Sequence, residues 1–164
     1  FTDESREHLL REGKYQERFD GGIRVSCIMK WPGNIPASTQ CDEMITGMDL
    51  FTTFADLAGA QIPTDRVIDG KDIQPLMKNE KGAKSPHKAV YGFTATGRLM
   101  SVRYKNWKLI LPGKHWTGNF ETPQLYDLNN DQGEEINVAD AHPKVVQEMT
   151  ELSDNAAAAP PNPV

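Results

Sequence analysis

The chain has 164 residues, of which 38% are hydrophobic and 25% are charged, and its formal net charge is −5. This length suits one domain of ordinary size. The negative charge gives no general attraction to nucleic-acid phosphates, and no segment reaches the roughly 18 apolar residues of a membrane span. We therefore expect neither a nucleic acid nor a membrane as a partner. The sequence starts without Met or a signal region, which suggests a piece of a longer protein.

The first predicted element is a strand over about residues 23–31. Apolar residues alternate with polar ones there, which is the period of a half-buried strand. Gly21-Gly22 predicts a tight bend before this strand, and Pro32-Gly33 predicts its end. Two cysteines are too few for a disulfide framework, so we expect free thiols, with Cys27 buried on the apolar face of the strand.

A helix is predicted next, over about residues 50–58. Asp49 can cap its first N–H groups, and Gly59 can take the left-handed conformation that ends it. The apolar stripe of this helix consists of Phe51, Phe54, Ala55 and Ala58. We expect residues 1–60 to form one part of the molecule. Residues 61–88, rich in Pro, Gly and Lys, are expected to form a linker.

Residues 89–152 predict a small separate domain of short strands closed by a helix. The strands are expected at about residues 89–94, 98–104, 107–111 and 124–128. Residues 104–107 predict a hairpin turn, because Asn106 tolerates a positive φ. A long loop is expected at about residues 112–123. A helix with Pro143 in its first turn is expected at about residues 143–152, and a flexible tail at 153–164. The predicted fold class is α+β.

Four sequence patterns, in order, resemble those of the sulfatases, which are enzymes of the alkaline-phosphatase superfamily. The patterns are Asp20-Gly21-Gly22-Ile23-Arg24 with Trp31-Pro32-Gly33, Met48-Asp49-Leu50-Phe51 with Leu57-Ala58-Gly59, Ile68-Asp69-Gly70-Lys71-Asp72 with Pro75-Leu76, and Leu125-Tyr126-Asp127-Leu128 with Glu134 and Asn137. They cover roughly residues 9–152 and match the C-terminal third or so of a complete sulfatase. The resemblance implies the end of the α/β sulfatase domain, then a small four-stranded antiparallel sheet packed by a C-terminal helix.

The resemblance also implies the hydrolysis of sulfate esters of small molecules or carbohydrates. Sulfatases use a formylglycine nucleophile, made in a Cys/Ser-x-Pro-x-Arg motif, and a divalent cation, usually calcium. Neither Cys27 nor Cys41 begins such a motif. We therefore expect the nucleophile and the cation to lie in a missing N-terminal portion, and this chain alone to bind no cofactor and to be inactive. Export to an extracellular or periplasmic location is expected by resemblance alone.

Few residues of this chain are candidates for a functional site. Lys14 ends a Leu-Arg-x-Gly-Lys pattern whose Lys contacts the sulfate in sulfatases, although five residues separate Lys14 from Asp20 where four are common. Asp3 is a weak candidate for a metal ligand, since Asn and Gly do not follow it. A cation and two aromatic rings that suit an anionic sugar or aryl sulfate are supplied by Lys114, His115 and Trp116. The alternative for Lys14 is an exposed Lys in a charged loop, and the alternative for residues 114–116 is an ordinary exposed loop with a partly buried Trp.

The remaining polar residues are expected to have structural roles only. The histidines outside the candidate site show no spacing typical of a metal site or a triad, so we expect surface positions for His8, His87 and His142. The acidic cluster of residues 127–131 lacks the Gly and Glu of a calcium-binding EF-hand loop and predicts a turn.

Two other functions remain compatible with the sequence. A phosphodiesterase or phosphonate hydrolase of the same superfamily would share these C-terminal patterns. A non-catalytic carbohydrate-binding module would have to fold alone, yet the helix at about residues 50–58 would then leave its apolar stripe exposed.

Overall fold

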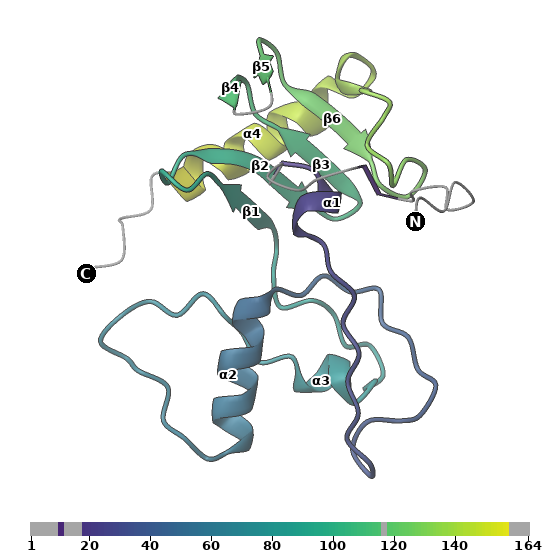
Figure 1. The fold of residues 1–164 in the computed structure, drawn as a ribbon, viewed down its shortest axis with the longest axis vertical. Helices are drawn as coiled ribbons and strands as arrows, with labels where there is room; N and C mark the ends of the chain where they lie inside the picture. The colour runs from purple at the N-terminus through teal and green to yellow at the C-terminus, as the bar shows by residue number, and fades with distance from the viewer. Residues whose placement is uncertain (1–9, 12–17, 116–117, 158–164) are drawn as a thin grey trace, which may run out of the picture. The chain divides into compact units, whose positions relative to one another are not determined.

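The computed structural model describes residues 10–11, 18–115 and 118–157, and these form two compact units (Figure 1). The sheet unit contains the described residues up to 26 and from 89 onwards. The helix unit contains residues 27–88. This division differs from the predicted one, because residues 18–26 belong with the C-terminal sheet and residues 61–88 form a unit with the helix before them.

The sheet unit is built on a four-stranded antiparallel sheet in the order β1-β2-β3-β6. Its strands are β1 (Val90–Phe93), β2 (Leu99–Tyr104), β3 (Trp107–Ile110) and β6 (Gln124–Asp127). The four strands predicted from the sequence are therefore confirmed. Tyr104 pairs with Trp107 across the predicted hairpin, but Lys105, with φ 54°, takes the positive φ in place of Asn106.

Helix α4 (Pro143–Ala157) runs across one face of the sheet, after a 3-10 turn η1 (Ala139–Ala141) (Figure 1). The core between helix and sheet contains Val102, Tyr104, Leu109, Leu125 and Met149. Alternate residues of each strand contribute to this core, as a pleated strand requires. The helix extends five residues beyond the predicted end, so part of the predicted tail is helical.

Phe19, immediately before α1 (Asp20–Ile23), lies on the opposite face of the sheet. Phe19 packs there with Ile110, Tyr126 and Leu128. Residues 112–123, predicted as a loop, instead contain a second small ladder formed by β4 (Gly113–His115) and β5 (Gly118–Phe120).

The predicted strand over residues 23–31 is absent from the structure. Residues 20–23 form the short helix α1, and residues 24–31 belong to no helix or strand. Val25 and Ile28 are 83% and 95% exposed, and Cys27 is exposed where the alternation predicted burial. An alternating pattern marks a face suited to burial, but a strand also needs a neighbour for its backbone hydrogen bonds.

The helix unit contains α2 (Gly47–Leu57) and the single-turn α3 (Gln74–Met77). The predicted helix is confirmed, but it begins three residues earlier than predicted because Thr46 is its N-cap residue. Asp49 therefore lies inside the first turn. Neither this helix nor any other in the described part of the chain has the length and apolar character that crossing a bilayer requires.

Candidate functional site

A buried ionic cluster lies on the face of the sheet away from α4; we call it the Asp20 cluster, consisting of Asp20, Arg103, Lys108 and Glu134. Lys108 Nζ lies 2.7 Å from Asp20 Oδ1, and Arg103 Nη1 lies 2.7 Å from Asp20 Oδ2. The main-chain N–H of Asp20 donates to Glu134 Oε2 at 2.6 Å. Lys108 Nζ is also 3.7 Å from Glu134 Oε1. Two carboxylates and two cations therefore share one buried site.

The strand period explains why these residues meet. Lys108 alternates with the core residue Leu109, so its side chain lies on the opposite face of β3. Arg103 alternates in the same way on β2 and is paired with Lys108 in the ladder. Glu134, with φ 54°, lies in the turn after β6. Residues from two of the sequence patterns, 114 positions apart, are thereby joined.

The cluster shifts the pKa values of its two carboxyl groups in opposite directions. Burial alone would raise the pKa of Asp20, but the charge and hydrogen bond of Lys108, with Arg103, outweigh it and lower the pKa below its ordinary value. Burial raises the pKa of Glu134, and the Lys108 charge offsets only part of this effect. The cluster thus holds Asp20 as a carboxylate and disfavours ionisation of Glu134.

The Asp20 cluster fixes the chain rather than offering a reactive group. Asp20 and Lys108 are each only 1% exposed, so no substrate can reach them. Arg11, in the first described segment, donates from Nη1 to the main-chain oxygen of Glu134 at 3.0 Å. Glu134 therefore anchors described residues on both sides of residues 12–17.

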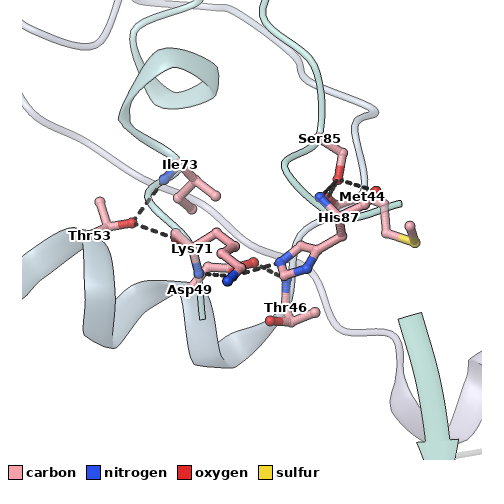
Figure 2. Close-up of polar contacts among 8 residues, drawn as sticks. All are labelled: Met44, Thr46, Asp49, Thr53, Lys71, Ile73, Ser85 and His87. Atoms are coloured by element: carbon pink, nitrogen blue, oxygen red, sulfur yellow. Dashed lines mark hydrogen bonds and ion pairs between the residues drawn. The ribbon is translucent and has the colours of Figure 1, made fainter. Parts of the chain in front are cut away.

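A second polar cluster, the Asp49 cluster, occupies the start of α2 (Figure 2). Asp49 Oδ2 accepts from the Thr46 N–H at 2.6 Å, and its Oδ1 accepts from the Lys71 N–H at 2.8 Å. The imidazole Nε2 of His87 lies 2.7 Å from the same Oδ1. Asp49 is fully buried, and burial would raise its pKa, but these hydrogen bonds outweigh that effect and lower it.

The surface position expected for His87 is wrong. Its side chain is only 11% exposed and is bound to Asp49. Beside it, the Ser85 hydroxyl donates to the Met44 main-chain oxygen at 2.5 Å and accepts from the His87 N–H at 3.1 Å (Figure 2). Ser85 therefore closes a turn, whereas a nucleophilic serine would face an imidazole nitrogen.

Gly70 shows why the Asp-Gly pattern matters in the helix unit. A Cβ at this buried position would clash with the Met48 carbonyl and lie 2.9 Å from Thr52 Oγ1. The chain therefore passes directly against the first turns of α2, where only glycine fits. The next residue, Lys71, then reaches Asp49 through its main-chain N–H.

A hollow of about 310 Å³ in the helix unit does not suit an anionic substrate. Three carboxylates, from Asp42, Glu43 and Glu80, lie among its lining residues. They would repel a sulfate ester. Elsewhere, in the turn after β6, Asp127 and Asp131 accept hydrogen bonds from following residues, as the turn prediction requires.

The predicted site residues are not gathered into one site by the described structure. Lys14, Asp3 and Trp116 lie outside the described residues. Lys114 is exposed on β4, where its main-chain oxygen accepts from Arg98 Nη1 at 3.0 Å. His115 ends the same strand, and its side chain lies outside the described part. Across the ranges 10–11, 18–115 and 118–157, no three His, Cys, Asp or Glu residues form a group suited to a metal ion, so these residues do not fit calcium by themselves.

The family model described as N-sulphoglucosamine sulphohydrolase, C-terminal, matches residues 12–158. The chain belongs to this sulfatase family. Human steryl-sulfatase is 38% identical over 116 residues, which cover 71% of the chain and 19% of that enzyme. The N-acetylgalactosamine-6-O-sulfatase of Bacteroides thetaiotaomicron is 28% identical over 156 residues, which cover 90% of the chain and 30% of that enzyme.

A solved structure also matches this sulfatase chain; it is described in connection with the metabolism of multiple glycosaminoglycans by Bacteroides thetaiotaomicron. It superposes with a TM-score of 0.74 at 27% identity, over 90% of this chain and 32% of its own. The sulfatase chain thus spans less than a third of the length of these relatives. The sequence-based family assignment and the predicted four-stranded sheet with its C-terminal helix are confirmed.

Sequence reasoning missed the residues that hold the sulfatase patterns together. Lys108 interrupts an apolar run of strand residues. A charged residue at such a position indicates a buried ion pair, so this pairing could have been predicted. The Thr46-x-x-Asp49 spacing is that of a capping box. No sequence signal connects His87 with Asp49 or Glu134 with Asp20, because these contacts are made only in the folded chain.

Proposed function

We propose that the complete protein is a sulfuric ester hydrolase and that this chain supplies its C-terminal portion. The family match over residues 12–158 carries this proposal. The named relatives are sulfatases, and they extend well beyond the part that this chain matches. The proposed substrate is a sulfate ester of a small molecule or a carbohydrate.

The nucleophile of such an enzyme lies outside these 164 residues. No Cys or Ser in the sequence begins a Cys/Ser-x-Pro-x-Arg motif. The described residues do not form a calcium site either. On this proposal, formylglycine and the divalent cation belong to the rest of the complete protein, which is exported to an extracellular or periplasmic location.

Lys14 is the proposed contribution of this chain to sulfate binding. A sulfate ester carries negative charge that increases on the leaving oxygen during hydrolysis, so a fixed cation stabilises the transition state. Lys14 lies in sequence between Arg11 and Asp20, and both of these residues are hydrogen-bonded to Glu134. Lys114, His115 and Trp116 are proposed to contact the remainder of the substrate.

The test is hydrolysis of 4-nitrophenyl sulfate by the complete protein. We expect turnover by the complete protein, none by the 164-residue chain, and a sharp fall on Lys14→Ala. Exposed Lys81 provides the matched control, because Lys81→Ala should leave turnover unchanged. Activity on a phosphonate monoester in place of the sulfate would reject the sulfatase proposal. Normal turnover by the Lys14 variant would reject only the role of Lys14.

A further inference from the structure

The side chain of Arg98 binds the start of strand β4 at two points. Arg98 Nη1 donates to the Lys114 main-chain oxygen at 3.0 Å, and Nη2 donates to the Pro112 main-chain oxygen at 3.0 Å. Carbonyl groups alternate in direction along an extended chain, so oxygens two residues apart share one edge. A planar guanidinium suits two acceptors placed in this way. We call this contact the Arg98 clamp, formed by Arg98 with the main chain of Pro112 and Lys114.

Gly113, between the two acceptors, makes the close approach possible. Its φ is 137°, which side chains other than that of glycine rarely allow. A Cβ at this position would also overlap Arg98 Nη2. The guanidinium therefore lies in the space that a side chain would occupy, and the Arg98 clamp requires glycine at position 113.

Arg98 is itself held by the turn between β1 and β2. The Arg98 N–H donates to Thr94 Oγ1 at 3.0 Å, and the Arg98 main-chain oxygen accepts from the Thr94 N–H at 2.8 Å. Gly97, with φ 80°, donates its N–H to the Thr94 main-chain oxygen at 2.9 Å. Since β1 and β2 belong to the four-stranded sheet, the Arg98 clamp joins β4 to that sheet.

The ladder of β4 and β5 needs such a connection. It is a separate two-stranded ladder of three residues on each strand (Figure 1). An isolated pair of strands is only marginally stable in water. On β5, the Phe120 ring lies 4.3 Å from the guanidinium carbon of Arg18. Each strand of the ladder thus has its own contact with the rest of the sheet unit, and the contact of β4 is the Arg98 clamp.

We propose that Arg98 is a positioning residue, which holds Lys114 for contact with an anionic group of the substrate away from the sulfate ester that is hydrolysed. This inference rests on the proposed function, in which Lys114 contacts the remainder of a sulfate ester. Lys114 is exposed, while its main-chain oxygen is bound by Arg98. Its ammonium group is therefore accessible from solvent, and the backbone that carries it is fixed.

The chemistry of the clamp favours one of the two proposed kinds of substrate. Arg98 and Lys114 are two exposed cations joined by a hydrogen bond, in a chain whose net charge is −5. Such local positive charge attracts an anionic ligand. A fixed backbone also loses less conformational freedom when a ligand binds. A carbohydrate with several sulfate or carboxylate groups therefore fits this surface better than the ester of an uncharged small molecule.

Binding of a fluorescein-labelled heparin oligosaccharide to the complete protein, measured by fluorescence anisotropy, tests the proposal. Lys114→Ala should raise the Kd about fivefold, which is the size expected of an exposed charge contact. Arg98→Ala should raise it to a similar extent. In both variants the Kd should change more than kcat for 4-nitrophenyl sulfate, which carries no second anionic group. An unchanged Kd, or an equal fall in kcat, for Arg98→Ala would overturn the proposal.

Two further variants disturb the clamp without removing the charge of Arg98 from the protein. Arg98→Lys retains a cation but lacks the planar fork that binds both carbonyl groups. Gly113→Ala places a methyl group against the guanidinium. Both should raise the Kd as Arg98→Ala does, and they replace that variant if it does not fold. The original Kd in both would show that Arg98 acts through its own charge, which would overturn the positioning role.

A double variant tests whether Arg98 acts through Lys114. Arg98→Ala combined with Lys114→Ala should bind the oligosaccharide no more weakly than Lys114→Ala alone, because the two changes remove one contact. Additive losses would contradict the proposal. Arg66→Ala is the matched control, since Arg66 is an exposed arginine of the helix unit paired with Asp65, and it should leave both Kd and kcat unchanged.

The two readouts distinguish this proposal from the sulfatase proposal. An inactive complete protein that still shows these changes in Kd would reject the sulfatase activity and keep the role of Arg98 in anion binding. An active complete protein that does not bind the heparin oligosaccharide would keep the sulfatase activity and overturn the role of Arg98.

Discussion

The sheet unit and the helix unit bury opposite kinds of residue. In the sheet unit, the described buried apolar residues lie on both faces of the sheet: Phe19, Met100, Val102, Tyr104, Leu109, Ile110, Leu125, Tyr126, Leu128 and Met149. In the helix unit they are Ile73 and Leu76 alone, among the residues described. There α2 instead buries Asp49, Thr52 and Thr53 while its phenylalanines are exposed.

This difference shows which unit has the means to fold by itself. Apolar burial is the main favourable term in folding, and the sheet unit has a two-sided core closed by α4. The helix unit is held by hydrogen bonds to Asp49 and Thr53, each of which adds only a modest net stability. The sheet unit therefore has a two-sided apolar core, whereas few apolar side chains are buried among the described residues of the helix unit.

The largest expected effect is the loss of the Lys108 charge from the sheet unit. Lys108→Met leaves Asp20 and Glu134 buried with less compensation, which should lower the free energy of unfolding by about 3–5 kcal/mol. Urea unfolding followed by tryptophan fluorescence measures this change. Lys144→Met, at an exposed position of α4, is the control and should change it little. A loss below about 1 kcal/mol for Lys108→Met would show that the cluster is not the anchor of residues 18–20.

The next effect contrasts the core of one unit with the exposed face of the other. Leu109→Ala removes a fully buried side chain and should cost about 2–5 kcal/mol. Phe51→Ala in the 164-residue chain removes a half-exposed ring and should change the free energy of unfolding by less than about 0.5 kcal/mol. Equal costs, measured by chemical unfolding, would mean that α2 is already packed within this chain.

Two glycines of the helix unit should respond in opposite directions. Gly70→Ala creates a clash with the Met48 carbonyl and should destabilise α2 by about 1–3 kcal/mol. Gly47→Ala meets no atom within 4 Å and should stabilise the helix by about 0.5–1 kcal/mol. The rate of amide hydrogen exchange in α2 measures the stability of the helix in both variants. Slower exchange for both variants would argue against the close approach at Gly70.

The smallest expected effect concerns pH and the sheet unit. The pKa of Asp20 is lowered in the folded state, so its stabilisation is present above its unfolded value of about 3.9 and is lost as pH falls through the folded value. The pKa of Glu134 is raised, so its contribution is present below about 4.3 and is lost as pH rises through the folded value.

Glu134→Gln separates these two contributions. The variant should keep the loss of stability at low pH but no longer lose stability as pH rises above about 4.3. Urea unfolding at a series of pH values measures the loss of stability at low pH and the loss above about pH 4.3. If the variant still lost stability as the pH rose, another group would be responsible for that titration.

The strands of the sheet, its hairpin at Tyr104–Trp107, helix α4 and the sulfatase family were all accessible from the sequence. The local signals suffice there: strand periodicity, turn residues and the N-terminal Pro143 of α4 act within a few positions. The candidate site was far less accessible. Lys14 and Asp3 were proposed from family patterns and lie outside the described residues, and Lys114 is exposed on β4 rather than in a loop.

The sequence by itself determined which segments of this sulfatase chain could form strands and helices, because backbone propensity and hydrophobic period act locally. Tertiary structure alone decided that residues 23–31 lack a strand partner, that Asp20 meets Lys108 and Glu134, and that His87 meets Asp49. It also decided which side of α2 is buried. Charge pairing and close packing depend on which distant segments the fold brings together, and no local pattern in the chain encodes that choice.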